Sequence, residues 1–494
     1  MVEASRRLIA ASAPEKPAQD GKSASDEIFS GATPKKPASD SVAAGSQSSN
    51  PSGLQPSAPA AAPVPKKLPL VARWKSAVTD GAGPLVVAAF AWNFLTIAAY
   101  SIIGPARGAL LMTKFGPETL PWVYMASAVL TGLVVVGYNK LAKGASRKKI
   151  IGGSLAMLAA TLVGGALAVK AAALPAVAFG YYLWTDVFGI MSMTLFWTYQ
   201  NDVFKRDEAK RSFGLIAAGA PLGSIVGALL MKTLVGSLGP VPMLMVAAVI
   251  FAAVLPIFFW MERRAGDRKA ADTHSAEDAA RPKPAQGIVK TILQSPFLLA
   301  LTLLVALERL VPDISNYLYS VAAKAAYAND AVGMAQMFAD VNFWTSLASF
   351  GVSSLLVGLT LKKIGIGGSL MTAGLVNLAL FLMFPFMPAL ALTAMFWGLD
   401  GVARYTWFKT AKETSYSATD RDTIYRVKAF IEMFVYRFAR GLAGLLLLGV
   451  AWAGGGAAAA AIVGVPLALL WLWSAWKVGR EHKKLEDANK AAGK

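Results

Sequence analysis

Five arginines lie within long apolar stretches of this sequence, where a charged side chain is costly: Arg107, Arg309, Arg404, Arg437 and Arg440. At the centre of a membrane-spanning helix such a charge costs roughly 2.5 to 3.5 kcal/mol unless it is paired or hydrated. A guanidinium group also presents several donors in a planar fork that suits phosphate and carboxylate groups. These arginines are therefore candidates for binding an anionic substrate.

Acidic residues share the apolar stretches and give the arginines an alternative, structural role: Asp186, Glu308, Asp313, Asp340, Asp400 and Glu432. Asp400 precedes Arg404 by four residues, and Arg309 precedes Asp313 by four, which is the spacing of ion pairs along one helix. For these two arginines the sequence supports structural pairing and substrate contact equally.

The other arginines lack such local partners. No acid lies within a helical turn of Arg107, and we expect Pro105 to break the helix just before it. A broken helix that presents a cation and free backbone N–H groups is typical of anion sites in transporters. Arg437 and Arg440 share a helix face, Glu432 is poorly placed to neutralise either, and lipid phosphates are their expected structural partners.

The sequence contains no cysteine and only two histidines, His274 and His482. A disulfide scaffold, zinc or haem ligation, Ser-His or Cys-His catalysis and a histidine proton relay are therefore not expected. We predict no metal site, no cofactor and no enzymatic activity. If protons are coupled to transport, carboxyl groups in the apolar stretches must carry them, and the candidates are Asp186, Glu308, Asp313 and Asp400.

The composition predicts an all-α integral membrane protein. Of the 494 residues, 55% are hydrophobic and 16% are charged, and the mean hydropathy is +0.49. Twelve stretches approach the ~20 residues that a helix needs to cross a bilayer. They run roughly over 83–104, 119–138, 150–169, 173–200, 212–235, 240–260, 295–318, 333–357, 367–385, 388–408, 425–449 and 453–476.

These stretches define the expected domains. Residues 1–82 form a basic tail and entry segment, expected to be disordered up to about residue 68 because it is rich in Ala, Ser, Pro and Lys without apolar periodicity. Two six-helix halves follow at 83–260 and 292–476, joined by a polar linker at 261–291. Residues 477–494 form a second tail.

The distribution of basic residues predicts the orientation in the membrane. The even-numbered connections between the twelve stretches carry 23 lysines and arginines, whereas the odd-numbered connections carry 4. By the positive-inside rule, both termini and the linker face the cytoplasm. The net charge of +19 is then a signal of topology, so the expected partner is the lipid bilayer and not nucleic acid.

Two six-helix halves joined by a cytoplasmic linker are the plan of the major facilitator superfamily, whose halves rock about a central site. Faint internal symmetry agrees with this plan, because a Gly-containing turn with a basic cluster follows both the second and the eighth stretch. The superfamily's usual Asp is missing from both turns.

Two segments carry specific motifs. Residues 196–204 read FWTYQNDVF and continue into EAKRSFGLI at 208–216, and residues 412–416 read KETSY. These segments, together with the region around Pro105 and Arg107, resemble the non-mitochondrial ATP/ADP translocase family, the nucleotide transporters of plastids and intracellular bacteria. The resemblance extends from about residue 83 to 476. Small residues from Gly223 to Gly227 in the first segment predict a face for close helix packing.

The resemblance implies a secondary transporter that exchanges ATP for ADP and needs charged residues in spans 1, 4, 7 and 10. By position, the span-1 cation matches Arg107, the span-4 acid is close to Asp186, and the basic residue of the KE-x-x-Y motif is Lys412. The span-7 acid is either Glu308 or Asp313.

The predicted substrate-binding set combines these positions with the other charged and polar candidates: Arg107, Asp186, Asn201, Arg404, Lys412, Glu413, Tyr416 and Arg437. A polyphosphate needs several cations drawn from both halves. Trp92, Tyr199, Trp407 and Tyr416 could stack on an adenine ring, although aromatic residues at span ends more often anchor the helix at the membrane interface.

The cargo stays open at this stage. Arg107 replaces the lysine that energy-parasite members usually have, and Thr414-Ser415 replaces their Met-Ala. The first hypothesis is a monomeric nucleotide transporter of a bacterial cytoplasmic membrane, working by exchange or by proton-coupled uptake. The alternative keeps the fold and moves another phosphorylated or anionic metabolite, or flips a lipid-linked anion. A receptor or scaffold that transports nothing would tolerate neutralisation of Arg107 and Lys412.

Overall fold

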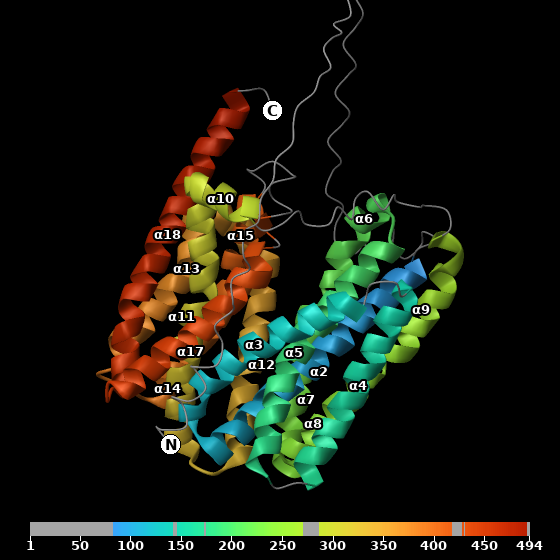
Figure 1. Cartoon of the computed structure of the whole chain (residues 1–494), viewed down its shortest axis with the longest axis horizontal. Coiled ribbons are helices and arrows are strands. Elements are labelled where there is room, and N and C mark those ends of the chain that lie inside the picture. The colour runs from blue at the N-terminus through green and yellow to red at the C-terminus, as the bar shows by residue number, and fades with distance from the viewer. Residues whose placement is uncertain are drawn as a thin grey trace, which may run out of the picture. The chain divides into compact units, whose positions relative to one another are not determined.

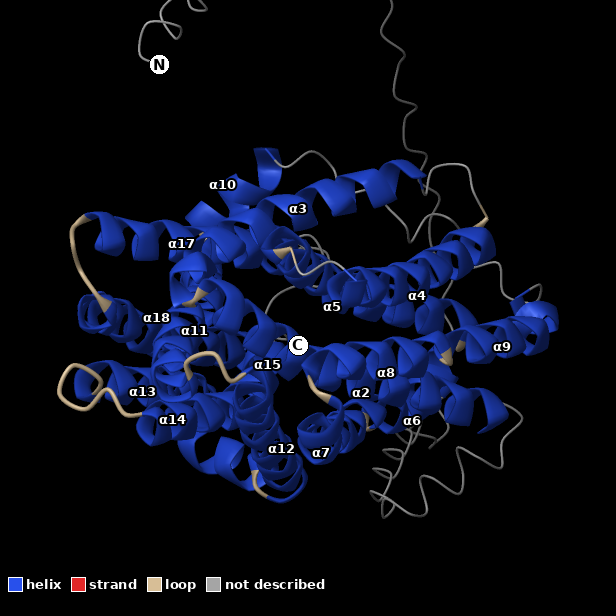
Figure 2. Ribbon diagram, turned by 90° about the horizontal axis from the view of Figure 1, so that it is seen from below, coloured by secondary structure: helices blue, strands red, loops and turns tan. Residues whose placement is uncertain are grey.

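The computed structural model describes residues 83–141, 146–171, 174–269, 286–416, 427–428 and 430–491. Within these ranges the regular elements are helices and no strand occurs, as Figure 2 shows. The all-α prediction is therefore confirmed. The predicted N-terminal tail lies outside the described residues.

The helices of the first half follow one another between Gly83 and Lys269 (Figure 1). Prolines begin α5 and α8, where the missing N–H would have no partner in any case. Gly239, with a φ of 82°, ends α7 in a conformation that favours glycine. The elements are α2 (Gly83–Phe115), η1 (Pro117–Thr119), α3 (Leu120–Leu141), α4 (Arg147–Ala171), α5 (Pro175–Val203), α6 (Arg206–Ala217), α7 (Gly219–Leu238), α8 (Pro240–Ala252) and α9 (Val254–Lys269).

The second half is also a succession of helices, from Gln286 to Ala491. The side chain of Ser295 caps α11, and the side chain of Asp330 caps α12 by accepting from two backbone N–H groups. Two short segments, η2 and η3, are π-helical. The elements are α10 (Gln286–Gln294), α11 (Pro296–Tyr327), α12 (Ala331–Leu355), α13 (Val357–Met383), α14 (Leu390–Ala403), η2 (Arg404–Phe408), α15 (Lys409–Tyr416), η3 (Ile431–Val435), α17 (Tyr436–Trp452) and α18 (Ala457–Ala491).

A helix stands at each of the twelve apolar stretches that the sequence predicts to cross the membrane. By length and composition, seven helices of the described chain qualify as spans, and one further bent pair, 287–294 with 296–327, would raise this to eight. The protein is therefore an integral, multi-pass membrane protein. The full count of twelve spans and the cytoplasmic side of the termini stay predictions.

Several helices run further than the sequence indicated. Helix α2 continues through Pro105 to Phe115, so the expected break before Arg107 is wrong. Contacts of α2 with α5, α7 and α8 hold the helix on both sides of the proline, which offsets the lost backbone hydrogen bond. Helix α9 extends to Lys269 into the predicted linker, and α18 extends to Ala491 through the predicted C-terminal tail.

A glycine face joins α7 to α2. A Cβ atom built on Gly223 would lie 2.2 Å from the carbonyl oxygen of Phe94, and one on Gly227 would lie 2.3 Å from that of Ala98. Only glycine permits the two backbones to approach this closely. The packing role predicted for the segment from Gly223 to Gly227 is confirmed.

The most extensive contacts between the two halves are those of α3 with α17, α7 with α12, and α2 with α12. Figure 2 shows α3 beside α17 and α7 beside α12. On the second pair, the Lys232 Nζ atom lies 2.5 Å from the Asp340 Oδ1 atom, and the hydroxyls of Ser224 and Ser346 are 2.8 Å apart. Helix α6 packs on α2 and α7, whereas α15 packs on α13 and α18, so each stays with its own half.

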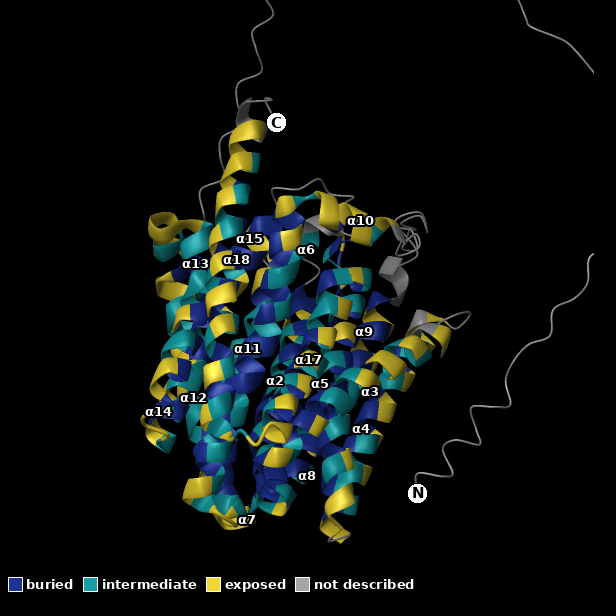
Figure 3. Cartoon of the chain, turned by 60° about the vertical axis from the view of Figure 1, so that its left-hand side comes forward, coloured by how far each residue is buried: buried dark blue, intermediate teal, exposed yellow. Residues whose placement is uncertain are grey.

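Exposed residues lie along the outer faces of the helices (Figure 3), and many of them are large apolar side chains. Examples are Leu133 on α3, 65% exposed, and Ile462 on α18, 61% exposed. Exposure on this scale would be costly in water but is favourable against lipid acyl chains. The pattern agrees with a protein embedded in a bilayer.

Candidate functional site

The guanidinium of Arg107 on α2 is bound by α5. Its Nη2 atom lies 2.7 Å from the Asp186 Oδ1 atom, and its Nη1 atom donates to the Thr185 hydroxyl at 2.7 Å and to the Tyr182 carbonyl at 3.3 Å. The same group lies 4.4 Å from the centre of the Tyr182 ring. Arg107 is 9% exposed. The acid that the local sequence lacks is therefore supplied by another helix.

Asp186 joins the two halves. Its second oxygen, Oδ2, lies 2.9 Å from the Arg440 Nη2 atom on α17 and accepts a hydrogen bond from the Ser127 hydroxyl on α3 at 2.8 Å. One buried carboxylate thus holds an arginine from each half. The expectation that lipid phosphates neutralise Arg440 is wrong, because its side chain turns towards α5 and not towards the outer surface.

A second carboxylate continues this chain of charges. Asp313 on α11 lies 2.9 Å from the Arg309 Nη2 atom, as the four-residue spacing predicted, and 4.0 Å from the Arg440 Nε atom. The Tyr436 hydroxyl accepts a 3.5 Å hydrogen bond from Arg309. We call Arg107, Asp186, Arg440, Asp313 and Arg309 the charge network.

The charge network carries an excess of positive charge. With its acids ionised, three guanidinium groups face two carboxylates, so one positive charge is left over. The Nε atoms of Arg309 and Arg440 are buried and donate no hydrogen bond within the described part of the chain. Their side chains nevertheless keep 20% and 15% of their surface exposed, so a small anion can reach them. Buried donors without acceptors are costly, and phosphate oxygens would satisfy them.

Asp400 and Arg404 form the second pair predicted from the four-residue spacing. The Asp400 Oδ2 atom lies 2.7 Å from the Arg404 Nε atom, and its Oδ1 atom accepts from the Asn377 amide at 2.6 Å. Asn377 in turn accepts from the Ser315 hydroxyl at 2.5 Å. Arg404 begins the π-helical segment η2, and such segments are frequent at functional sites.

Lys412 on α15 is held by Glu308 on α11. The Lys412 Nζ atom lies 2.8 Å from the Glu308 Oε2 atom and 3.9 Å from the Glu432 Oε1 atom. Burial of the ammonium lowers the pKa of Lys412, but the Glu308 carboxylate outweighs burial, and the net pKa is raised above its usual value. Lys412 is therefore cationic at neutral pH and already paired. Glu432, for which the spacing of charges predicted no partner, is its second neighbour.

We expect the contributions of Lys412 and Glu308 to the stability of the protein to depend on each other. Lys412→Gln should lower the melting temperature of the purified protein, because it leaves Glu308 and Glu432 close together without a cation. The double variant Lys412→Gln/Glu308→Gln should recover most of the loss, and a thermal melt of all variants measures this coupling. A double variant as unstable as the single one would show that the pair does not stabilise the fold.

The remaining sequence candidates do not join the charge network. Asn201 is exposed near the end of α5, and Glu413 pairs with Lys428 at 2.6 Å on the surface. Tyr416 is 4% exposed and lies beneath the Lys428 ammonium, 4.9 Å from its ring centre. Arg437 is partly exposed in the first turn of α17, and no ion pair is recorded for it among the described residues.

The aromatic candidates are also placed elsewhere. Trp92 and Tyr199 are 0% and 1% exposed in a cluster with Phe258 inside the first half, so they cannot contact a substrate in this conformation. The tyrosines beside the cations went unnoticed in the sequence. The Arg309 guanidinium lies 5.5 Å from the centre of the Tyr436 ring. The Arg107 guanidinium lies 5.8 Å from the Tyr100 ring, and that of Arg404 lies 5.7 Å from the Tyr405 ring.

The described residues contain no group of three or more His, Asp or Glu side chains arranged to hold a metal ion. The charge network lies between two helical halves in a protein whose outer surface is apolar. This fold, with a buried cluster of charges between two helical halves, is that of a membrane transporter.

Comparison with known proteins identifies the family. Residues 86–407 match the Major Facilitator Superfamily, and the chain belongs to this family. Among solved structures of similar fold, the nucleoside transporter NupG has a TM-score of 0.55 at 13% identity, over 81% of this chain and 99% of that one. A POT family transporter in complex with a thioalcohol-conjugated peptide has a TM-score of 0.57 at 10% identity, over 83% and 99%. These likenesses establish the fold.

Sequence relatives support the resemblance drawn from the motifs. "ADP,ATP carrier protein 1" of Chlamydia muridarum is 23% identical over 365 residues, covering 64% of this chain and 68% of the relative. The protein of the same name from Chlamydia trachomatis is 23% identical over 343 residues, covering 61% and 64%. The resemblance to ATP/ADP translocases is confirmed, and the chain matches about two thirds of the length of these relatives.

Proposed function

We propose that the protein is a secondary transporter of nucleotides that works by alternating access, by exchange of the ATP/ADP type or by proton-coupled uptake. The observation that carries this proposal is the position of Asp186, whose carboxylate binds Arg107 of one half and Arg440 of the other at 2.7 and 2.9 Å. A carboxylate that bridges two arginines occupies the place of a phosphate group.

The proposed cycle exchanges this internal anion for a substrate anion. A phosphate of the substrate competes with Asp186 for Arg107 and Arg440 and accepts hydrogen bonds from the unpartnered Nε atoms of Arg309 and Arg440. Loss of the Asp186 bridge releases one link between the halves, so that they can rock and expose the site to the other side. After the substrate leaves, Asp186 rebinds both arginines and resets the link.

The acids released in this step are the candidates for coupling. When a substrate phosphate takes the arginines, Asp186 and Asp313 lose cationic neighbours, which favours proton uptake by their carboxyl groups. Glu308 and Asp400 keep Lys412 and Arg404 and so are weaker candidates. In an exchange mechanism no proton is required, because a nucleotide from the other side replaces the first one.

The names of the relatives and the surroundings of the arginines support a nucleotide. The Chlamydia relatives are named ADP,ATP carriers, and one structural neighbour is named a nucleoside transporter. Tyrosine rings lie beside Arg107, Arg309 and Arg404, where an aromatic base could stack. We further propose that the protein acts as a monomer in a bacterial cytoplasmic membrane, with the linker and termini in the cytoplasm.

Uptake into proteoliposomes tests this function. Purified full-length protein is reconstituted, and entry of labelled ATP and ADP is followed with the vesicles empty, preloaded with nucleotide, or under an imposed pH gradient. Exchange predicts that internal nucleotide stimulates uptake at least tenfold, whereas proton coupling predicts stimulation by the gradient in empty vesicles. The proposal would be contradicted if neither internal nucleotide nor a pH gradient stimulates uptake and if uptake is no faster than in vesicles without protein.

A second cargo class is favoured by one observation. The ion pairs of the charge network offer guanidinium groups to an anion, and any phosphate-bearing molecule satisfies such groups whatever the rest of its structure. Another phosphorylated metabolite or a lipid-linked anion would satisfy the same arginines. If unlabelled sugar phosphates or lipid-linked phosphates compete with ATP as well as ADP does, this alternative replaces the nucleotide assignment.

A further inference from the structure

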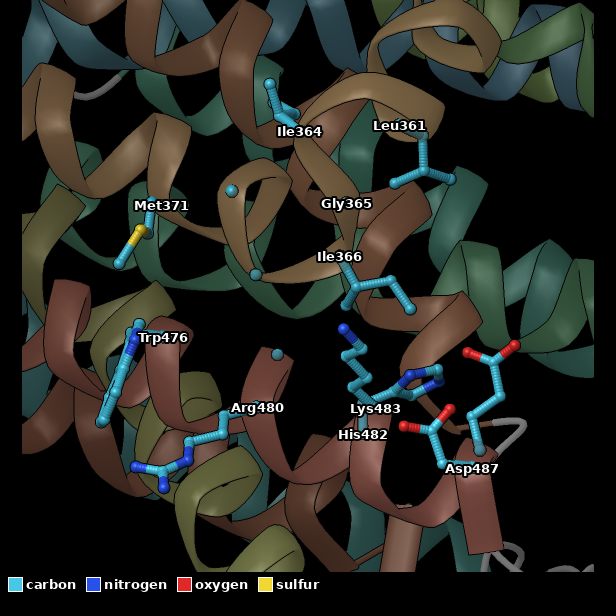
Figure 4. A pocket seen from close by; sticks show the side chains of 14 residues that line it. Leu361, Ile364, Gly365, Ile366, Met371, Trp476, Arg480, His482, Lys483 and Asp487 are labelled. Atoms are coloured by element: carbon cyan, nitrogen blue, oxygen red, sulfur yellow. The ribbon is translucent and has the colours of Figure 1, made fainter. Parts of the chain in front are cut away.

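A cavity of about 530 Å³ lies outside the charge network, between α13 and the C-terminal part of α18 (Figure 4). Its floor is formed where the two helices cross at Gly367 and Gly479, whose backbones are close enough that a Cβ on Gly479 would lie 2.5 Å from the Gly367 Cα atom. Gly365, with a φ of 67°, interrupts α13 at the wall of the cavity. The chain thus holds this space open with a local kink and a close helix crossing.

The cavity lies at the level where the lipid-facing surface of α18 becomes charged. Leu469, Trp473 and Trp476 are 51%, 47% and 48% exposed and follow one face of the helix. The next positions on the same face, at spacings of three or four residues, are Arg480 and Lys483, which line the cavity. Tryptophan followed by basic residues marks the boundary between acyl chains and headgroups.

One buried side chain in the cavity lacks a partner. His482 is 8% exposed, and its Nε2 atom makes no hydrogen bond within the described residues. A histidine ring is mostly neutral at pH 7, because its ordinary pKa is about 6.5. The ring makes a hydrogen bond to the backbone of Thr414, and in a neutral ring the nitrogen that donates to a carbonyl holds the only ring proton. Nε2 of the neutral ring is then an acceptor that lacks a donor.

The charges around His482 are of both signs. Figure 4 shows His482, Lys483 and Asp487 grouped at one end of the cavity, with Arg480 beside Trp476 at the other. The Arg480 guanidinium lies 5.4 Å from the Trp476 ring. Within the described chain, no ion pair is recorded for Arg480, Lys483 or Asp487. A ligand that carries an anion and a hydrogen-bonding cation would complement this arrangement.

We propose that this cavity binds the headgroup of an aminophospholipid from the adjoining leaflet. Arg480 and Lys483 bind its phosphate, while the Nε2 atom of His482 and the Asp487 carboxylate accept hydrogen bonds from its primary ammonium. The acyl chains lie along the exposed face of α18 that carries Trp473 and Trp476. This lipid site is separate from the charge network and does not depend on which substrate the protein transports.

The test compares lipids that differ in one chemical feature. Purified full-length protein is mixed with equal amounts of phosphatidylethanolamine, phosphatidylcholine and phosphatidylglycerol, and the bound lipids are counted by native mass spectrometry. The quaternary ammonium of phosphatidylcholine has no N–H group, so we expect at least fivefold more bound phosphatidylethanolamine. Equal binding of these two lipids, or preference for phosphatidylglycerol, would overturn the proposal.

The substituted residues, Lys483 and Asp487, are exposed, so we expect their variants to fold like the wild-type protein. Asp487→Asn should reduce phosphatidylethanolamine to the level of phosphatidylcholine, and Lys483→Gln should reduce both lipids. Lys484→Gln is the matched control, because Lys484 is 58% exposed and pairs with Glu481. An Asp487→Asn protein that keeps the wild-type preference would contradict the assignment. So would competition by free phosphoethanolamine at concentrations similar to the lipid, which would identify a soluble ligand instead.

Discussion

Arg107→Ala should lower the initial rate of nucleotide uptake by about 100-fold or more. The guanidinium of Arg107 makes a 2.7 Å ion pair with Asp186. In the proposed cycle it is one of the two arginines that leave Asp186 and bind the substrate phosphate. Contacts between charged groups contribute about 1.5 to 3 kcal/mol each, and a loss near 2.7 kcal/mol corresponds to about 100-fold in rate. Initial rates in proteoliposomes, corrected for the amount of inserted protein, measure the effect.

Two control variants separate lost transport from lost folding. Removal of one partner from a buried pair is itself destabilising, by about 3–5 kcal/mol. The double variant Arg107→Ala/Asp186→Ala removes both charges, so we expect it to fold better than Arg107→Ala and to remain inactive. Lys114→Ala, at the end of the same helix, should transport at the wild-type rate. If the double variant regains uptake, Arg107 serves only to neutralise Asp186, and the proposed anion exchange is wrong.

Gly223→Ala and Gly227→Ala should each destabilise the protein strongly. The added Cβ atoms would lie 2.2 and 2.3 Å from backbone carbonyl oxygens of α2, and backbone cannot move aside as a flexible side chain can. Helices α2 and α7 must therefore separate, which also disturbs the contact of both helices with α12. Overpacking typically costs about 1–3 kcal/mol at a single position, so we expect the melting temperature to fall by roughly 5 °C or more.

Gly236→Ala provides the matched control for this prediction. Gly236 lies on the same helix, but a Cβ atom there would meet nothing within 4 Å. In a helix interior alanine is favoured over glycine by about 1 kcal/mol, so this variant should melt at or above the wild-type temperature. If the Gly223→Ala and Gly236→Ala proteins have the same melting temperature, the close approach of α2 and α7 is not required for the stability of the protein.

The positions of the helices along the chain could be predicted from the sequence because they depend on local composition. Apolar length and the positions of lysine and arginine are properties of contiguous residues, and a helix stands at each predicted stretch. The pairs Arg309–Asp313 and Asp400–Arg404 were foreseeable for the same reason, since a four-residue spacing fixes their geometry on one helix.

Local rules failed where neighbouring helices intervene. Pro105 should end a helix in isolation, yet α2 continues because adjacent helices pack along its length. The aromatic candidates failed similarly. Trp92 lies within the first apolar stretch and Tyr199 at the end of the fourth, and contact of either ring with a substrate base was considered. Tertiary packing instead buries both rings against Phe258.

The sequence by itself determined the class of protein, the apolar segments, the candidate charges and the family resemblance, because each of these follows from residue type and short-range spacing. Only the tertiary structure decided which charges meet. Arg107, Asp186 and Arg440 come from three helices far apart in the chain. They converge because α2 packs on α5, and because α3 packs on both α5 and α17. An ion pair forms only when its charged atoms come within about 4 Å of each other, so the pairing of these residues depends on helix packing that no local pattern encodes.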